Sequence, residues 1–247
     1  MAIPGPTLGL VVMPLHIGIV ACSAEGAALC YRTLCAEAPA RLGPHAHPEV
    51  TMHTPSLALY VDCLKHGDLQ GVAELMLASA HKLAGAGADF LICPDNTIHE
   101  ALPRLVGRSP LPWLSIAEVV AAEARRRGYR RLGLTGTRWL VESPVYPNAL
   151  AAQGLGCERP DAGQRAEIGR IIMDELVGGV IKLASVAYFQ RVIEDLKASG
   201  CDAVILGCTE IPLIIDNAYS ALPTLDSTRL LARAALERAL GEPGTSA

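Results

Sequence analysis

Apolar runs that stop abruptly at a reactive side chain are the clearest feature of this chain. Residues 90–93 are apolar and lead into Asp95, and residues 203–206 are apolar and lead into Cys208; a threonine follows each reactive group within two positions. Short apolar runs bounded by turn residues predict buried strands of a parallel sheet. We therefore expect the two reactive groups to lie at the carboxyl ends of two strands.

Apolar segments of strand length alternate along the chain with longer segments of helical periodicity. Strands are predicted at 16–22, 50–54, 90–93, 111–114, 131–137 and 203–206, and helices at 24–36, 68–86, 96–106, 116–128, 162–197 (with a break at Gly178-Gly179) and 228–240. Residues 37–48 are expected to form a loop, and Ser23 to cap the first helix. This alternation, in a chain with few aromatic residues, predicts an α/β fold.

Three segments of the first half recur in the second half in the same order. The pairs are Gly18-Ile-Val with Gly133-Leu-Thr, Asp89-Phe-Leu-Ile-Cys-Pro-Asp95 with Asp202-Ala-Val-Ile-Leu-Gly-Cys208, and Leu111-Pro-Trp-Leu-Ser115 with Leu222-Pro-Thr-Leu-Asp226. Their nearly constant offset indicates an internal duplication. We predict two pseudo-symmetric subdomains, 1–115 and 116–227, each a parallel sheet flanked by helices, with the helix at 228–240 packing back onto the first. The active site is expected in the cleft between them.

Composition narrows the classes of function. The 247 residues carry a formal net charge of −4, which argues against a nucleic-acid partner, and no uninterrupted apolar run of membrane-spanning length is present, so no membrane partner is expected. The apolar stretch from Leu8 is expected to be a leading segment followed by the first strand. The eight cysteines contain no CxxC pair, which argues against a zinc knuckle, and so many unpaired thiols suit a reducing cytoplasm.

A carboxylate and a thiol on opposite walls of a cleft can remove a proton from one face of a flat carbon and return one to the other. Asp95 and Cys208 are therefore the candidate catalytic residues for racemising a carbon acid without a cofactor. Backbone N–H groups and polar side chains beside them would bind the substrate carboxylate and stabilise the developing charge. The candidate substrate-binding residues are Asn96, Thr97 and Thr209, with Ser23, Thr137 and His53 at the edges of the cleft.

A structural role is the alternative for each candidate. Asp95 precedes a helical pattern and could be only an N-cap, and Cys208 could be a small buried hydrophobe. Glu210 is expected in the first turn of a helix, where the dipole favours a carboxylate. The histidines around residue 50 sit in a loop without the spacing of a metal site, so no metal is expected.

Asp95-Asn-Thr-Ile-His99 and Leu206-Gly-Cys-Thr-Glu-Ile-Pro212 resemble the two signature motifs of the aspartate/glutamate racemase superfamily. The resemblance implies two pseudo-symmetric α/β subdomains, commonly a homodimer, no cofactor, and one cysteine from each half acting on opposite faces of the α-carbon. By position it implies that Cys208 is the second catalytic cysteine and that Asn96, Thr97 and Thr209 bind the substrate carboxylate.

The chain departs from the superfamily pattern at two places. Asp95 stands where the first motif usually has a cysteine, and the usual glycine-rich first loop is Ala21-Cys-Ser-Ala-Glu-Gly26, in which Cys22 is no obvious substitute because it ends a different strand. The expected activity is racemisation or epimerisation of an acidic amino acid by Asp95 and Cys208. The alternatives are a single-cysteine lyase or isomerase, similar to arylmalonate decarboxylases or maleate isomerases, and a non-catalytic carboxylate-binding protein.

Overall fold

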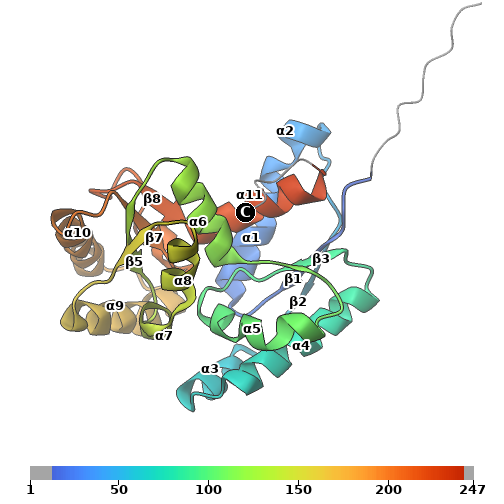
Figure 1. Ribbon diagram of the computed structural model, residues 1–247, viewed down its shortest axis with the longest axis horizontal. Coiled ribbons are helices and arrows are strands. Elements are labelled where there is room, and N and C mark those ends of the chain that lie inside the picture. The colour runs from blue at the N-terminus through green and yellow to red at the C-terminus, as the bar shows by residue number, and fades with distance from the viewer. Residues whose placement is uncertain (1–12, 242–247) are drawn as a thin grey trace, which may run out of the picture.

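The computed structural model of the protein describes residues 13–241 and contains two four-stranded parallel sheets (Figure 1). The first has the order β2-β1-β3-β4, formed by β1 (Ile17–Val20), β2 (Val50–His53), β3 (Phe90–Ile92) and β4 (Trp113–Leu114). The second has the order β6-β5-β7-β8, formed by β5 (Arg131–Thr135), β6 (Gly156–Glu158), β7 (Ala203–Leu206) and β8 (Thr224–Asp226). Both sheets have the same order of successive strands, which confirms the duplicated α/β fold.

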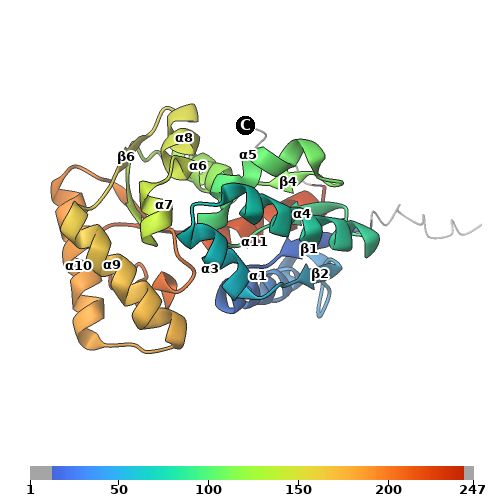
Figure 2. The ribbon, with the colours of Figure 1, turned by 90° about the horizontal axis from the view of Figure 1, so that it is seen from below.

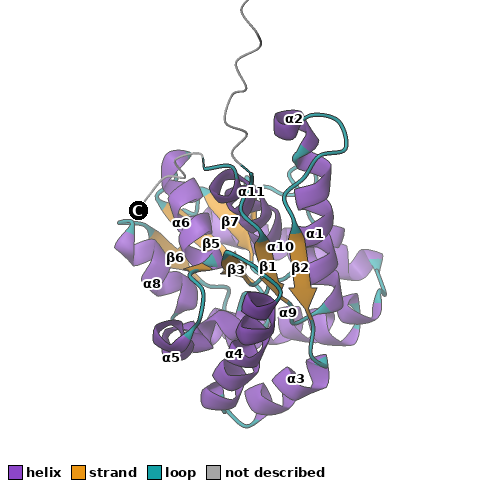
Figure 3. Ribbon diagram, turned by 90° about the vertical axis from the view of Figure 1, so that its right-hand side faces the viewer, coloured by secondary structure: helices purple, strands orange, loops and turns teal. Residues whose placement is uncertain are grey.

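Helices cover both faces of each sheet (Figure 3). The α-helices are α1 (Ala24–Glu37), α2 (Pro39–Leu42), α3 (Leu57–Lys65), α4 (Leu69–Gly85), α5 (Leu102–Leu105), α6 (Ile116–Arg126), α7 (Arg138–Glu142), α8 (Val145–Ala152), α9 (Ala162–Asp174), α10 (Leu183–Ala198) and α11 (Ser227–Ala239). Short 3-10 turns occur at η1 (Thr97–Ala101), η2 (Val106–Arg108), η3 (Leu176–Gly178) and η4 (Ile211–Leu213). None of the helices described is long and apolar enough to cross a membrane.

Successive residues of β1 point to opposite faces of its sheet and enter different cores. Ile17 and Ile19 pack with α1 and α11, whereas Val20 packs on the other face with α3 and α4. This period of two explains why the strand reads as a continuous apolar run in the sequence. The last helix, α11, follows β8 of the second sheet but packs against α1 of the first half and against α6, so it joins the two halves.

Residues that recur in the sequence make equivalent contacts in both halves. The Asp89 carboxylate accepts the backbone N–H of His16 at 2.7 Å, before β1, and the Asp202 carboxylate accepts that of Arg130 at 2.7 Å, before β5. The repeated glycines make room for a leucine of the covering helix: a Cβ at Gly18 would lie 3.3 Å from the Cβ of Leu83 in α4, and a Cβ at Gly133 would lie 3.3 Å from the Cβ of Leu196 in α10. The repeat therefore preserves how each strand is anchored and packed.

The structure corrects several local predictions. Helices α3, α7 and α8 and strand β6 were not predicted, and the expected loop at 37–48 contains α2. The helix predicted at 96–106 is divided into η1, α5 and η2, because Pro103 lacks an N–H and interrupts the ladder of hydrogen bonds. The break at Gly178-Gly179 is confirmed, with Gly179 at φ 71°. The division of the chain at residue 115 stays a prediction, and the leading segment from Leu8 begins outside the described residues.

Candidate functional site

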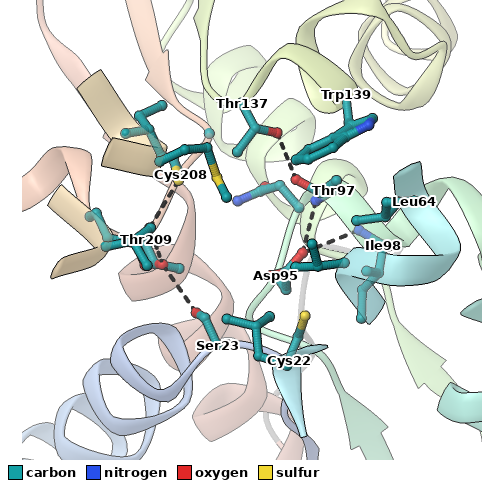
Figure 4. Close-up of a pocket in the computed structure, with 18 residues that line it drawn as sticks. Cys22, Ser23, Leu64, Asp95, Thr97, Ile98, Thr137, Trp139, Cys208 and Thr209 are labelled. Atoms are coloured by element: carbon teal, nitrogen blue, oxygen red, sulfur yellow. Dashed lines mark hydrogen bonds between the residues drawn. The ribbon is translucent and has the colours of Figure 1, made fainter. Parts of the chain in front are cut away.

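The two halves of the chain lie side by side in Figure 2. The pocket that holds the candidate catalytic groups lies at the carboxyl ends of strands from both sheets (Figure 4). Cys22 and Ser23 follow β1, Asp95 and its neighbours follow β3, Thr137 follows β5, and Cys208 and its neighbours follow β7. The pocket has a volume of about 590 Å³, which includes space open to solvent. The carboxyl ends of parallel strands are where such sheets generally bind ligands.

Asp95 is half-buried at the edge of the pocket and is held by the turn that follows it. Its Oδ1 accepts the backbone N–H of Thr97 at 3.0 Å and of Ile98 at 3.1 Å. Removal from water raises the pKa of Asp95, and the N–H of Ile98 and the Cys22 thiol oppose this rise by favouring the ionised form. Asp95 thus caps η1 and also presents a carboxyl group whose pKa lies above its ordinary value.

His99 fixes the loop that carries Asp95. The ring Nε2 accepts the backbone N–H of Ile116 at 3.3 Å, so the proton of the neutral ring is on Nδ1, which donates to the Asp95 carbonyl at 2.6 Å. Burial lowers the pKa of His99 to about 4. The imidazole is therefore neutral near pH 7, and it serves as a structural link between the loop and the start of α6.

Cys208 faces the pocket from the second half and donates a hydrogen bond to a buried carboxylate. Its Sγ lies 2.9 Å from Oε2 of Glu210, which also accepts the Thr209 hydroxyl at 2.8 Å. Burial, and then the negative charge of Glu210, raise the pKa of Cys208 well above its ordinary value. Cys208 is accordingly a thiol at neutral pH, with its proton directed to Glu210.

Hydroxyl groups pair across the two halves around the same pocket. The Thr97 hydroxyl of the first half lies 2.9 Å from the Thr137 hydroxyl of the second. The Ser23 hydroxyl of the first half lies 3.5 Å from the Thr209 hydroxyl of the second (Figure 4). Ser23 and Thr137 are also the N-caps of α1 and α7. The structure therefore brings all four together, with each threonine of the motifs beside an N-cap of the opposite half.

Asn96 connects three elements beneath the pocket. Its Nδ2 donates to Ser227 Oγ at 2.9 Å, and its Oδ1 accepts the Tyr146 hydroxyl at 2.6 Å. Ser227 in turn donates to the Leu206 carbonyl at the end of β7. The buried amide lines the pocket, but its hydrogen bonds are to α8 and α11. Asn96 therefore ties the Asp95 loop to the strand that leads to Cys208.

His53 lies apart from the other candidate residues. It ends β2 and is outside the set that lines the pocket; its ring nitrogens lie 2.9 Å from Ser79 Oγ and 2.9 Å from Lys82 Nζ. Burial lowers the pKa of His53, with a smaller contribution from the charge of Lys82. Within residues 13–241, no group of three or more His, Cys, Asp or Glu side chains is arranged to hold a metal ion.

The Asp/Glu/hydantoin racemase family model matches residues 17–235, which include both sheets and every residue of the pocket. The chain belongs to this family.

Racemase relatives match most of the chain. The broad specificity amino-acid racemase RacX of Bacillus subtilis is 23% identical over 191 residues, which is 76% of this chain and 80% of RacX. The crystal structure of a putative Asp/Glu racemase from Yersinia pestis is 30% identical, covers 92% of this chain and 99% of its own, and has a TM-score of 0.85. An aspartate racemase homologue from Pyrococcus horikoshii is 26% identical, covers 91% and 98%, and has a TM-score of 0.79.

Two ionisable residues of the pocket in this racemase-family chain, Glu210 and Cys22, were not predicted as site residues. Glu210 was assigned to a helix start, yet its side chain contacts Cys208 and Thr209. Cys22 was set aside because it ends a different strand, but β1 and β3 are adjacent, so it lines the pocket near Asp95 (Figure 4). The strand order 2-1-3-4 was the missing information, because it makes β1 and β3 neighbours.

Proposed function

We propose that the protein is a cofactor-independent amino-acid racemase in which Asp95 and Cys208 exchange protons with opposite faces of Cα. The observation that carries the proposal is the position of these groups at the carboxyl ends of equivalent strands, β3 and β7, on two sides of one pocket. A carboxylate and a thiol placed in this way supply one base and one acid for a planar intermediate.

The resting protonation states suit one direction of the reaction. The Asp95 carboxylate takes the Cα proton, the electron pair of the C–H bond passes into the substrate carboxylate to form an enolate, and the Cys208 thiol gives its proton to the opposite face. Asp95 is then protonated and Cys208 is a thiolate. The negative Glu210 destabilises that thiolate, and the reverse direction starts from it. Because the enantiomers have equal free energy, the asymmetry would appear in kcat and KM separately and leave kcat/KM equal.

The lining of the pocket also supports an α-amino acid. The backbone N–H groups of Cys208 and Thr209 have no acceptor among the described residues, so they are available to a substrate carboxylate beside the four hydroxyl groups. Asp95 and Glu210 are the charged side chains of the lining, and both acids favour a ligand that carries an ammonium group. A malonate or maleate, with two carboxylates and no cation, would lack that compensation.

Deuterium exchange tests the proposed activity. Each enantiomer of a panel of amino acids, including aspartate and glutamate, is incubated with the protein in heavy water. We expect loss of the Cα proton signal in NMR, together with appearance of the other enantiomer on a chiral column. Absence of both changes with every amino acid would eliminate racemisation. Turnover of a malonate or maleate in the same assay would identify the lyase or isomerase alternative instead.

The pH dependence of kcat/KM should reflect the raised pKa values of Asp95 and Cys208. For either enantiomer, kcat/KM should fall as the pH drops through the pKa of Asp95, which burial raises above its ordinary range. It should also fall as the pH rises through the pKa of Cys208, which burial and Glu210 raise. A plateau across neutral and mildly alkaline pH is therefore expected. Replacing Glu210 by glutamine should shift the alkaline decline of kcat/KM to lower pH. If kcat/KM of the parent protein already declined as the pH rose through neutrality, this assignment would be contradicted.

A further inference from the structure

Much of the pocket lining consists of apolar side chains contributed by both halves. Leu57, Val61 and Leu64 come from α3, Trp139 from α7, and Met173 and Val177 from α9 and η3. Leu64, Ile98 and Trp139 gather beside Thr97 in Figure 4. The polar groups of the lining are concentrated in the four loops at the strand ends, whereas the apolar groups lie mainly on helices.

No lysine, arginine or histidine is among the described residues that line this pocket. Cations near its lining in sequence are engaged elsewhere: Arg138 pairs with Glu142, and Arg170 pairs with Glu167 and Glu175. The charged groups that do line it, Asp95 and Glu210, are both acids. A second carboxylate on a substrate would therefore lose water and meet like charges without a compensating cation.

An apolar substrate side chain would bind this pocket more favourably than a second carboxylate. It would remove both its own surface and the exposed faces of Leu57, Met173 and Val177 from water. Its presence adds no charge next to Asp95 and Glu210. We infer that the substrate of this racemase-family protein is an amino acid with an apolar side chain, in preference to aspartate or glutamate. This inference rests on the proposed function and names the substrate class of the same site.

Substrates whose side chains have similar shapes but different charge and polarity distinguish the effect of charge from the effect of size. Leucine, asparagine and aspartate form one set, and methionine, glutamine and glutamate form another. In the heavy-water exchange assay we expect kcat/KM for leucine and methionine to exceed that for aspartate and glutamate by about 100-fold, the size of effect expected from an uncompensated like charge. The amides should fall between them. Equal or faster exchange of the acidic members would overturn the apolar assignment, while no exchange in either set would instead remove the proposed racemase function.

A cation introduced into the apolar lining gives a second test. Val177 is 41% exposed and lines the pocket, whereas Val180 is 45% exposed and lies outside the lining. Val177→Arg should raise the kcat/KM of glutamate relative to methionine by about 10-fold, because the guanidinium compensates the extra carboxylate. Val180→Arg, which adds the same charge nearby, should leave that ratio unchanged. The same shift in both variants, or none in Val177→Arg, would contradict this placement of the substrate side chain.

Discussion

Replacing Cys208 by alanine is expected to lower the rate of racemisation by about 10³-fold, the usual contribution of a positioned acid or base. The variant loses the proton donor of one wall, while Asp95 and its loop contacts remain. Asp95 can still remove a proton from the enantiomer whose Cα–H faces it, and return one to the same face. We therefore expect this enantiomer to exchange its Cα proton in heavy water with retained configuration, and the other enantiomer not to exchange.

The measurement combines NMR of the Cα proton with chiral chromatography of the same samples. Cys35→Ala is the matched control, because Cys35 is a half-buried free cysteine of α1 that does not line the pocket. It should retain full racemisation. If Cys208→Ala still interconverted the enantiomers at a similar rate, the thiol would have no part in the proton transfer.

The duplication could be predicted because equivalent residues anchor and pack the first strand of each sheet. Asp89 and Asp202 hold the chain before the first strand of each sheet, and Gly18 and Gly133 leave space for a leucine. These residues recur with their spacing, so the equivalence of β3 and β7 followed from the sequence. The apolar runs predicted the strands because both faces of each sheet are buried.

The parts that were not predicted depend on features that the apolar pattern does not report: a short uncapped helix, the pairing of two strands and the geometry of one turn. Helix α3 is only nine residues long and has no side-chain cap, so no long periodic pattern marks it in the sequence. The position of Cys22 beside Asp95 depends on the pairing of β1 with β3. The hydrogen bond from Cys208 to Glu210 depends on the local turn after β7, which precedes the 3-10 turn η4 instead of forming the expected helix start.

The apolar lining of the pocket depends on the tertiary structure. Its residues come from α3, α7, α9 and η3, which are far apart in the chain. The motif residues around Asp95 and Cys208, by contrast, are contiguous and carry the resemblance to the family. Motifs of this kind report the chemistry at Cα, whereas the substrate side chain meets residues outside them. An acidic substrate was therefore expected from the motifs, and the lining supports an apolar one.

Replacing Asp95 by asparagine is the complementary change, with an expected loss of about 10²-fold to 10⁴-fold in kcat/KM. The amide is nearly the same size and its oxygen can still accept the N–H groups of Thr97 and Ile98. The fold should consequently survive, with a melting temperature within a few degrees of the parent, while the base on this wall is lost. Only the enantiomer whose Cα–H faces Cys208 could then exchange, and only where thiolate is formed.

Asp95→Cys tests whether the lost function is proton transfer or capping. A thiol is a poor acceptor for the N–H groups of Thr97 and Ile98 but is able to carry a proton. If Asp95 acts as a base, Asp95→Cys should recover activity that Asp95→Asn lacks, with its optimum at higher pH because a thiol has a higher pKa than a carboxyl group. If Asp95 only caps η1, the order is reversed: Asp95→Asn retains activity, and Asp95→Cys loses both stability and turnover. The two variants therefore separate the catalytic and structural roles of one carboxylate.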